Sequence, residues 1–328
     1  MPDSPIIWFD RRPVPELAEL APPEATIEWP ESDDPLDGID RAHGVIAGAS
    51  IIYDRDVFSL ATKLRVLVRA GIGFDNIVLS DATAAGVAAC NTPDGPTIST
   101  AEHALALIFS VTKGLKQSEN RLQRQEGNYG PNHNALELDG ARLTLIGLGR
   151  IGSRVAKVAT AAGIHVTAYD PFESDERFEA LGVTRSTDLG EAVSEAQIVS
   201  IHAPLSPQTR HLVDSNLIGG MRDGVFIVNT ARGGLIDDDA LLEALDSGKV
   251  GGAGLDVTEP EPLPSGHALL EHESVLVTPH VASATTAGRN RIFTMALDQV
   301  VAALAGIKPS HILNPEVWPG RNSNNKDA

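Results

Sequence analysis

The sequence has little cysteine and no long hydrophobic run, and each shortage excludes a class of protein. Its 328 residues contain a single cysteine, Cys90, which excludes an intramolecular disulfide framework and is expected to be a buried core thiol. No apolar run approaches the roughly 20 residues that are needed to cross a bilayer. Residues 1–5 lack the basic start and apolar stretch of a signal peptide. We therefore expect a cytoplasmic protein without membrane spans.

Positive charge is also scarce. Lysine and arginine number 26 against 44 aspartate and glutamate residues, so the formal net charge is −18 at pH 7, and only seven residues are lysine. A surface of this sign repels nucleic acids and anionic membranes, and neither is expected as a partner. The excess of aspartate and glutamate over lysine and arginine fits either an ordinary solvated surface or adaptation to a saline environment. No cysteine–histidine cluster indicates a metal site, and we expect none.

Strand-like and helix-like segments alternate along nearly the whole chain. Such alternation predicts a doubly wound parallel α/β sheet, and the length favours two domains. A helix with its N-cap at Ser99 or Thr100 is expected to continue to about Glu126, a final long helix is expected at residues 289–305, and the tail after Pro319 is expected to fray. Strands are expected at residues 6–9, 44–47, 64–68, 86–90, 142–146, 164–169, 198–201, 225–228, 254–257 and 275–277.

A glycine-rich turn between the strand at residues 142–146 and the following helix predicts a dinucleotide site. In the run 147–152 (GLGRIG), the first glycine permits a tight turn, the second lets backbone approach a pyrophosphate, and the third lets helix pack on strand. The helix N-terminus attracts the phosphates. Asp170 closes the next strand, and an acid there accepts from the ribose 2′-hydroxyl, which favours NAD over NADP. We expect cofactor contacts from Gly147, Gly149, Arg150, Ile151, Gly152 and Asp170.

Three chemically useful side chains follow later strands in succession. Arg232, Glu261 and His280 come after the strands at residues 225–228, 254–257 and 275–277, and open α/β sheets bind ligands at the carboxyl ends of their strands. Hydride transfer to a keto acid needs a cation for the carboxylate, a proton donor, and a group that orients the donor. These three residues could supply those functions.

The flanking residues carry a family resemblance. Residues 229–237 (NTARGGLID), 252–257 (GAGLDV) with Glu261, and 278–285 (TPHVASAT) resemble signatures of the D-isomer-specific 2-hydroxyacid dehydrogenases. Residues 69–76, 91–93 and 202–205 extend the likeness, which covers nearly the whole chain from about residue 44. The resemblance implies a Rossmann NAD-binding domain (residues 99–287) inserted into a flavodoxin-like α/β substrate domain (residues 1–98 and 288–328). It also implies a homodimer formed through the NAD-binding domain, with the helix from Ser99 in the contact.

The resemblance assigns roles residue by residue. His280 would be the general acid/base, Glu261 its partner, and Arg232 the group that binds the substrate carboxylate and polarises the carbonyl. The backbone of Ala70, Gly71 and Ile72 would complete the carboxylate site. Asp256 would accept the nicotinamide carboxamide, helped by backbone near Thr230 and Ala231. His103, His202 and His211 are expected to be structural, although His202 lies near the expected cofactor path.

The substrate is less clearly indicated. Phosphoglycerate dehydrogenases that resemble this chain often carry an arginine in the stretch that reads IAGASI here (residues 46–51), and the chain ends without room for their regulatory domain. We therefore expect a glyoxylate- or hydroxypyruvate-type substrate, with D-3-phosphoglycerate as the alternative. Formate dehydrogenases share the fold but resemble this chain less, because they use glutamine where Glu261 stands. An NAD-sensing corepressor is the alternative outside the enzymes.

Overall fold

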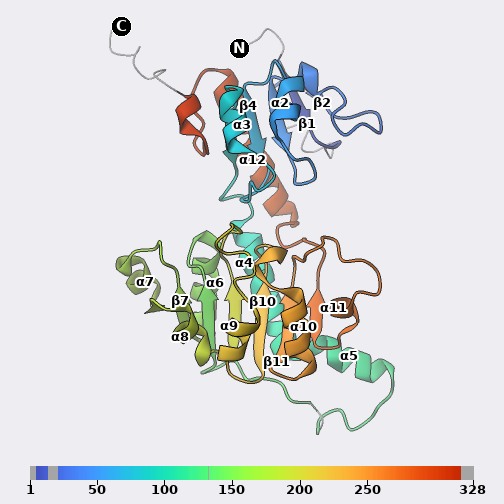
Figure 1. The fold of residues 1–328 in the computed structure, drawn as a ribbon, viewed down its shortest axis with the longest axis vertical. Helices are drawn as coiled ribbons and strands as arrows, with labels where there is room; N and C mark the ends of the chain where they lie inside the picture. Colours follow the sequence, from blue (N-terminus) through green and yellow to red (C-terminus); the bar gives the residue numbers. More distant parts are fainter. Residues whose placement is uncertain (1–4, 14–20, 132, 319–328) are drawn as a thin grey trace. The chain divides into compact units, whose positions relative to one another are not determined.

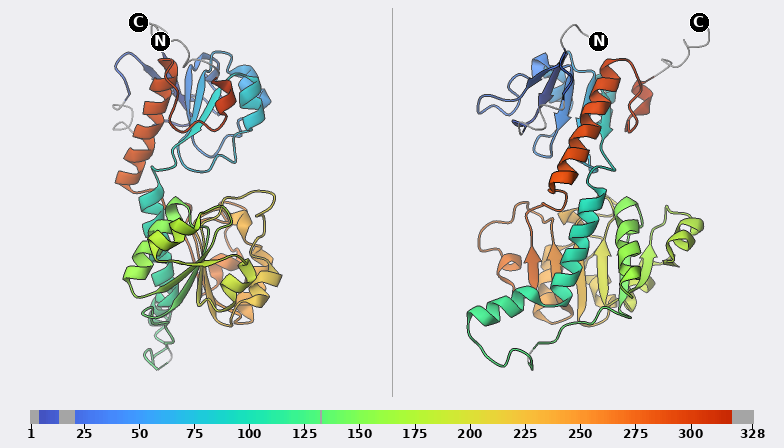
Figure 2. Two further views of the ribbon diagram at one scale, coloured as in Figure 1. Left: turned by 90° about the vertical axis from the view of Figure 1, so that its left-hand side faces the viewer. Right: turned by 180° about the vertical axis from the view of Figure 1, so that it is seen from behind.

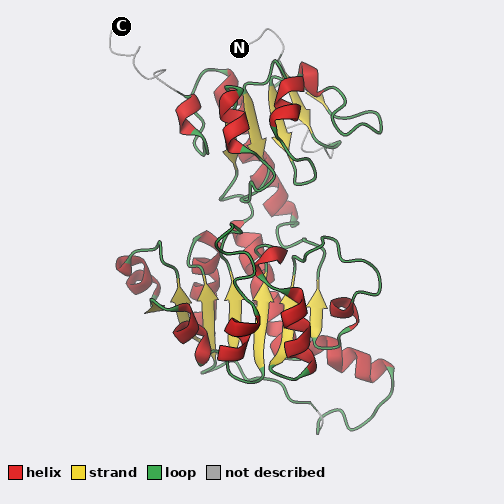
Figure 3. Cartoon of the chain, in the orientation of Figure 1, coloured by secondary structure: helices red, strands yellow, loops and turns green. Residues whose placement is uncertain are grey.

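The computed structural model describes residues 5–13, 21–131 and 133–318 of the chain. The chain divides into two compact units, one made of Met1–Pro96 with Thr285–Ala328 and the other of Thr97–Ala284. We call them unit 1 and unit 2. Each is built on one parallel sheet (Figure 3), which is the α/β class that the alternation predicts. In the described part of the chain, no helix is both long and apolar enough to span a membrane.

Unit 1 contains a five-stranded parallel sheet with strand order β2-β1-β3-β4-β5. Successive side chains of a strand point to opposite faces, so both faces of this buried sheet need cover. The helix α12 (Thr286–Leu304) covers one face (Figure 2), with Val300 and Leu304 in a cluster that includes Ile46 and Val68. The strands are β1 (Ile6–Phe9), β2 (Thr26–Glu28), β3 (Gly44–Ala47), β4 (Val66–Arg69) and β5 (Ala88–Asn91).

The other face of this sheet packs against short elements: η1 (Ile39–Arg41), α2 (Arg55–Leu60) and α3 (Leu79–Ala84). The element η3 (Pro315–Val317) follows α12. Cys90 is a free thiol buried among the residues under α12, and burial raises the pKa of this thiol to about 12. It is therefore a core residue, as expected, and not a nucleophile.

Unit 2 contains a seven-stranded parallel sheet with strand order β12-β11-β10-β9-β6-β7-β8 (Figure 1). The order reverses between β6 and β9, and open α/β sheets bind ligands at the carboxyl ends of the strands at such a switch point. The strands are β6 (Arg142–Ile146), β7 (His165–Tyr169), β8 (Thr184–Ser186), β9 (Ile198–Ile201), β10 (Val225–Asn229), β11 (Val250–Leu255) and β12 (Val275–Val277).

Two hydrophobic clusters cover the two faces of this sheet. One includes buried residues of α4 (Thr97–Thr112) and α6 (Arg150–Ala161), and the other includes those of α8 (Leu189–Ser194), α9 (Ser215–Gly220) and α10 (Asp238–Asp246). The remaining elements are α5 (Leu115–Gln123), α7 (Asp175–Leu181), η2 (Gly233–Leu235) and α11 (Ala268–Glu271).

The expected helix from Ser99 to about Glu126 is wrong in its extent. In the structure α4 begins at Thr97 and ends at Thr112, and α5 begins at Leu115. Gly114 separates the two helices with a φ of 57°, in the left-handed region that glycine adopts without strain. The chain therefore turns at this glycine, although polar helix-forming residues follow it.

Two other differences concern strands. β11 starts at Val250, whereas a strand was expected at residues 254–257. The first half of β11 contains glycines where another backbone segment approaches closely: a Cβ at Gly251 would lie 2.8 Å from the carbonyl oxygen of Gly224. The edge strands β2 and β8 are only three residues long and were not expected. The tail after Pro319 lies outside the described residues.

Candidate active site

The turn after β6 is held by backbone contacts that only glycine allows. Gly147 has a φ of 102°, and a Cβ there would lie 2.7 Å from the carbonyl oxygen of His202, which follows β9. A Cβ at Gly152 would collide with the carbonyl oxygen of Gly147. A Cβ at Gly149, by contrast, would meet nothing within 4 Å. The first and third glycines are therefore needed for packing, and the second leaves open space beside the turn.

The helix α6 begins directly after this turn. Gly149 is its N-cap and has no side chain to cap the first turn, which starts with Arg150 and Ile151. The first N–H groups of a helix have no intrahelical acceptor and carry the positive end of the helix dipole. This arrangement suits a phosphate group.

Asp170 ties the end of β7 to the glycine turn. Its carboxylate accepts hydrogen bonds from the backbone N–H groups of Leu148 at 2.8 Å and Phe172 at 3.0 Å. A carboxylate has about four acceptor positions, so these two bonds leave capacity for a ribose hydroxyl. The open space at Gly149, the helix N-terminus and this acid together fit a dinucleotide.

The loop after β10 leaves one hydroxyl group unused. The Asn229 side chain holds the loop, since its Oδ1 accepts from the N–H of Ala231 at 2.9 Å and its Nδ2 donates to the carbonyl of Arg232 at 2.8 Å. The Oγ1 atom of Thr230 is buried and makes no hydrogen bond in the described part of the chain. A buried polar group without a partner is costly, so this hydroxyl is suited to a polar group of a bound molecule.

The turn that carries Arg232 packs on the loop that carries Glu261. A Cβ at Gly233 would collide with the carbonyl group of Thr258, so the two loops touch through backbone. An Arg232 guanidinium N–H donates to the carbonyl of Ala231 at 2.6 Å. The positive charge of Arg232 is also close enough to contribute to a lowered pKa of Glu261. The structure thus brings Arg232 and Glu261 into one region of unit 2.

Glu261 and His280 form the most direct contact among the predicted residues. Glu261 Oε1 lies 2.6 Å from His280 Nδ1, and both side chains are partly exposed. Burial raises the pKa of Glu261, but the hydrogen bond and charge of His280 outweigh it, and the pKa lies below its ordinary value. Glu261 is therefore ionised at neutral pH and can orient the imidazole.

Asp256 lies at the end of β11 and is 1% exposed. Its Oδ1 accepts from Thr278 Oγ1 at 2.6 Å and from the N–H of Val281 at 2.9 Å, and its Oδ2 accepts from the N–H of Ala282 at 2.9 Å. Burial raises the pKa of Asp256, but hydrogen bonds from His103, Thr278 and these N–H groups lower it overall. In this structure its carboxylate binds the turn after His280, whereas the sequence suggested a contact with the nicotinamide.

Two histidines of unit 2 have partners that the sequence does not reveal. Burial lowers the pKa of His202 to about 4, so its ring is neutral at pH 7, and Nε2 lies 3.0 Å from Ser200 Oγ. His103 Nε2 lies 2.9 Å from Thr278 Oγ1 and 3.4 Å from Asp256 Oδ1. The sequence predicts a structural role for His103 and indicates no role for Thr278. Only the position of Thr278 two residues before His280 hints at a role.

The remaining predicted residues lie in unit 1, in the loop after β4. The N–H of Ala70 donates to the carbonyl of Ala47 at 2.8 Å, and that of Gly71 donates to the carbonyl of Arg69 at 2.9 Å. A Cβ at Gly71 would lie 2.6 Å from an Arg69 guanidinium nitrogen, so glycine permits this close approach. Two of the three N–H groups expected to bind a carboxylate thus have backbone acceptors, and Ile72 follows them.

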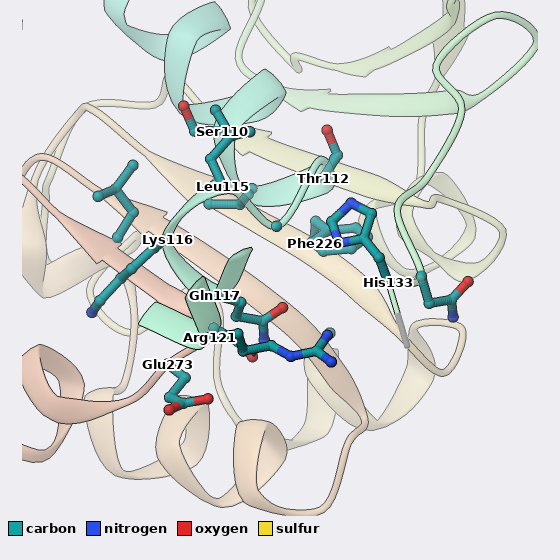
Figure 4. A pocket seen from close by; sticks show the side chains of 15 residues that line it. Ser110, Thr112, Leu115, Lys116, Gln117, Arg121, His133, Phe226 and Glu273 are labelled. Atoms are coloured by element: carbon teal, nitrogen blue, oxygen red, sulfur yellow. Dashed lines mark hydrogen bonds between the residues drawn. The ribbon is translucent and has the colours of Figure 1, made fainter. Parts of the chain in front are cut away.

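A separate pocket in unit 2, shown in Figure 4, lies between α4, α5 and the first residues of β10 and β11. The glycine turn and His280 follow the carboxyl ends of strands, so this pocket belongs to the opposite edge of the sheet. Its Lys116 Nζ donates to the carbonyls of Leu270, His272 and Val275, at 3.2, 3.1 and 2.7 Å. This cation is already used to hold the protein's own backbone, and we do not assign the pocket a catalytic role.

Comparison with known proteins agrees with this geometry. Residues 105–282 match the family model described as D-isomer specific 2-hydroxyacid dehydrogenase, NAD binding domain. The D-3-phosphoglycerate dehydrogenase of Methanocaldococcus jannaschii is 37% identical over 279 residues, which are 85% of this chain and 53% of that protein. The chain spans about half the length of the curated relatives it matches first.

Solved structures give the same result. A glyoxylate reductase from Paecilomyes thermophila has a TM-score of 0.83 at 26% identity, covering 96% of this chain and 100% of that one. A D-lactate dehydrogenase from Aquifex aeolicus, complexed with NAD and lactic acid, has a TM-score of 0.80 at 28% identity, covering 95% and 97%. With the glycine turn, the acid at Asp170 and these matches together, the chain belongs to the NAD-dependent D-isomer-specific 2-hydroxyacid dehydrogenases.

Proposed function

We propose that His280, Glu261 and Arg232 carry out the proton transfer and carboxylate binding of a D-2-hydroxyacid dehydrogenase. The observation that supports this most is the 2.6 Å contact between Glu261 Oε1 and His280 Nδ1. Because Glu261 occupies Nδ1, Nε2 is the ring nitrogen left to exchange a proton with a substrate. Bound NADH supplies the hydride for reduction of the keto carbon. His280 Nε2 then gives its proton to the carbonyl oxygen, and the reverse direction returns it.

Arg232 is proposed to bind the substrate carboxylate and to polarise the reacting carbonyl, since its planar group can donate two hydrogen bonds side by side.

In unit 1, substrate binding by the backbone of Ala70, Gly71 and Ile72 stays a proposal. The hydrogen bonds of Ala70 and Gly71 favour Ile72 as the donor among them. In unit 2, cofactor contacts are proposed for Gly147, Gly149, Arg150, Ile151, Gly152, Asp170 and Thr230, and for the backbone of Ala231. A contact of Asp256 with the nicotinamide carboxamide also stays a proposal.

The substrate that the comparisons favour is D-3-phosphoglycerate. Relatives named D-3-phosphoglycerate dehydrogenase are 37% and 39% identical to this chain over 85% and 79% of its length. The identity is higher than to the solved glyoxylate reductase and D-lactate dehydrogenase. We therefore propose oxidation of D-3-phosphoglycerate, or reduction of the corresponding keto acid, as the first function to test.

One observation in unit 1 favours a second candidate, an unphosphorylated acid of the glyoxylate or hydroxypyruvate type. The stretch 46–51 contains no cation, and the N–H of Gly48 donates to the buried carboxylate of Asp10 at 2.6 Å. Arg11 pairs with the Asp10 carboxylate at 3.5 Å and its guanidinium lies beside Gly48, so the negative charge of Asp10 is compensated and does not by itself exclude a phosphate group. The support for an unphosphorylated acid is therefore the absence of a cation from residues 46–51 themselves.

The experiment that separates these candidates is a comparison of phosphohydroxypyruvate with hydroxypyruvate, which differ only in the phosphate. NADH oxidation is followed with both, and with glyoxylate, pyruvate and oxaloacetate. A higher kcat/KM for phosphohydroxypyruvate supports the first candidate, and a higher value for hydroxypyruvate or glyoxylate supports the second.

His280→Ala is the control and should lower turnover by about 10²–10⁴-fold with NADH affinity nearly unchanged. If the variant and the wild type turn over every acid equally, catalysis by His280 is excluded and the corepressor alternative gains support.

Three further assignments stay proposals. Substrate binding is proposed for unit 1, and a cytoplasmic location is proposed from the single cysteine.

A homodimer is proposed through unit 2. The helix α5 supports this, because none of its residues is buried and its Leu115 and Leu122 are 56% and 62% exposed. Sedimentation of the purified chain tests the dimer, and a Leu122→Glu variant should then sediment as a monomer.

A further inference from the structure

Asp256 accepts three hydrogen bonds from the turn that carries His280. The N–H groups of His280, Val281 and Ala282 donate to three different oxygens of Asp256: its carbonyl oxygen at 2.7 Å and its two carboxylate oxygens at 2.9 Å each. His280 itself has a φ of 53°, a conformation that non-glycine residues adopt only when their surroundings enforce it. The position of the His280 ring therefore depends on how firmly the Asp256 carboxylate is held.

The bonds around Thr278 determine which atom of His103 bears a proton. The Thr278 hydroxyl has one hydrogen, and its oxygen lies 2.6 Å from Asp256 Oδ1 and 2.9 Å from His103 Nε2. A carboxylate can only accept, so the hydroxyl hydrogen belongs to the bond with Asp256. His103 Nε2 must then carry a hydrogen and donate it to Thr278 Oγ1. The result is a directed chain from His103 through Thr278 to Asp256.

This chain connects segments that are far apart in the sequence but belong to unit 2. His103 lies in α4, Asp256 directly follows β11, and Thr278 follows β12. Asp256 is 1% exposed and the His103 side chain is 23% exposed, so water competes little for the bonds between them. In such a setting, hydrogen bonds to a charged group are stronger than those at the surface.

We propose that His103 is a positioning residue for the reaction: through Thr278 it fixes the Asp256 carboxylate, which in turn holds the backbone from which His280 acts. The inference rests on the proposed function of His280. His103 needs no contact with substrate or cofactor for this role. Its loss should disturb the proton-transfer step and leave cofactor binding unchanged.

The test uses two pairs of variants of the full chain. His103→Leu and Thr278→Val remove the hydrogen-bonding atoms with little change of volume, whereas His103→Gln and Thr278→Ser retain a donor or hydroxyl. We expect the first pair to lower kcat by about 10- to 100-fold, the loss associated with a hydrogen bond to a charged group. NADH affinity should stay at the wild-type value, and the second pair should recover most of kcat. Glu102→Gln, an exposed neighbour on α4, is the matched control and should match the wild type.

A second readout does not depend on turnover. Amide hydrogen exchange of a peptide covering residues 280–284 should be faster in His103→Leu than in the wild type, and unchanged in Glu102→Gln. If His103→Leu and Thr278→Val match the wild type while His280→Ala is slow, the positioning role is overturned and the proposed function stands. If His280→Ala matches the wild type, the proposed function fails and this inference fails with it. An equal loss of kcat, NADH affinity and unfolding temperature would instead assign His103 a purely structural role.

Discussion

Glu261 Oε1 lies 2.6 Å from His280 Nδ1. Glu259, on the same loop as Glu261, pairs instead with Arg210 at 2.8 Å. Two glutamates separated by one proline thus have different partners. Since the pKa of Glu261 is lowered, mainly by His280 against the opposing effect of burial, this carboxylate keeps its charge in mildly acidic solution. The contact orients the imidazole through Nδ1 and leaves Nε2 to exchange a proton during reduction.

Glu261→Gln should therefore slow reduction, because it keeps an acceptor near His280 but removes the charge. We expect kcat for the keto acid to fall by about 10²-fold, within the range that general acid–base catalysis contributes. The decline of the rate in acid that protonation of Glu261 would cause should also be lost, since glutamine does not titrate. The measurement is kcat/KM against pH, with Glu259→Gln as control. An unchanged profile in Glu261→Gln would contradict the role of the pair.

Two glycines of the cofactor turn should respond differently to an added methyl group. Gly152→Ala forces a Cβ into the Gly147 carbonyl and should cost about 1–3 kcal/mol of the free energy of unfolding, as overpacked sites do. Gly149→Ala has open space and should leave the unfolding temperature near that of the wild type. It should nevertheless weaken NADH binding, because the methyl group occupies the space proposed for the pyrophosphate. Calorimetry for unfolding and NADH fluorescence titration distinguish the two effects, and tight NADH binding by Gly149→Ala would argue against this position for the phosphates.

Asp170→Ala should reduce the preference for NADH over NADPH. The variant removes a negative charge that repels a 2′-phosphate and an acceptor for the ribose hydroxyl. It also removes the bond to the Leu148 N–H, so NADH binding should weaken as well. Asp170→Asn is the informative control, because it can keep the bond to Leu148 while losing the charge. The measurement is the ratio of the dissociation constants for NADH and NADPH. A ratio equal to that of the wild type would show that Asp170 does not recognise the ribose 2′-hydroxyl.

Asp238 is a site where a charge destabilises the folded state. Burial, reinforced by the charges of Glu259, Asp237 and Asp239, raises its pKa from 3.8 to about 6, and its Oδ2 has no hydrogen-bond partner in the described part of the chain. Between these two pH values the folded form binds the proton more tightly than the unfolded chain, so stability falls as the pH rises through the window.

Asp238→Asn should stabilise the protein by about 1 kcal/mol at pH 7.5, a value reduced for partial exposure. The gain should shrink toward pH 5. Denaturant unfolding at both pH values measures it, beside the exposed control Asp239→Asn, and a gain that is independent of pH would exclude this explanation.

The sequence predicted the parts of the site that are local in the chain. Gly147, Gly149 and Gly152 are spaced within one turn, and the strand before them and the helix after them are visible in the pattern of apolar residues. Residues that follow strands, such as Arg232 and His280, could also be predicted to lie at the carboxyl edge of a parallel sheet. The resemblance to a family then supplied their roles, which no spacing alone would give.

The rest depends on contacts between distant segments. The carboxylate oxygens of Asp256 accept bonds from Thr278, Val281 and Ala282, and nothing in the local pattern around residue 256 predicts these contacts. His103 lies on an amphipathic helix where any polar residue at the same position would look alike. The break at Gly114 was missed for a related reason: a glycine inside a helical pattern is tolerated or ends the helix depending on packing.

The return of α12 to the sheet of unit 1 has a consequence for the order in which the chain acquires its structure. Ile46, Val66 and Val68 leave the ribosome early, but the helix residues that cover them, such as Val300 and Leu304, are synthesised after the whole of unit 2. Unit 2 is continuous and can bury its core as soon as it has emerged. The first 96 residues must wait with one face of their sheet uncovered. During translation this nascent segment is therefore the part of the protein most dependent on chaperones and most prone to aggregate.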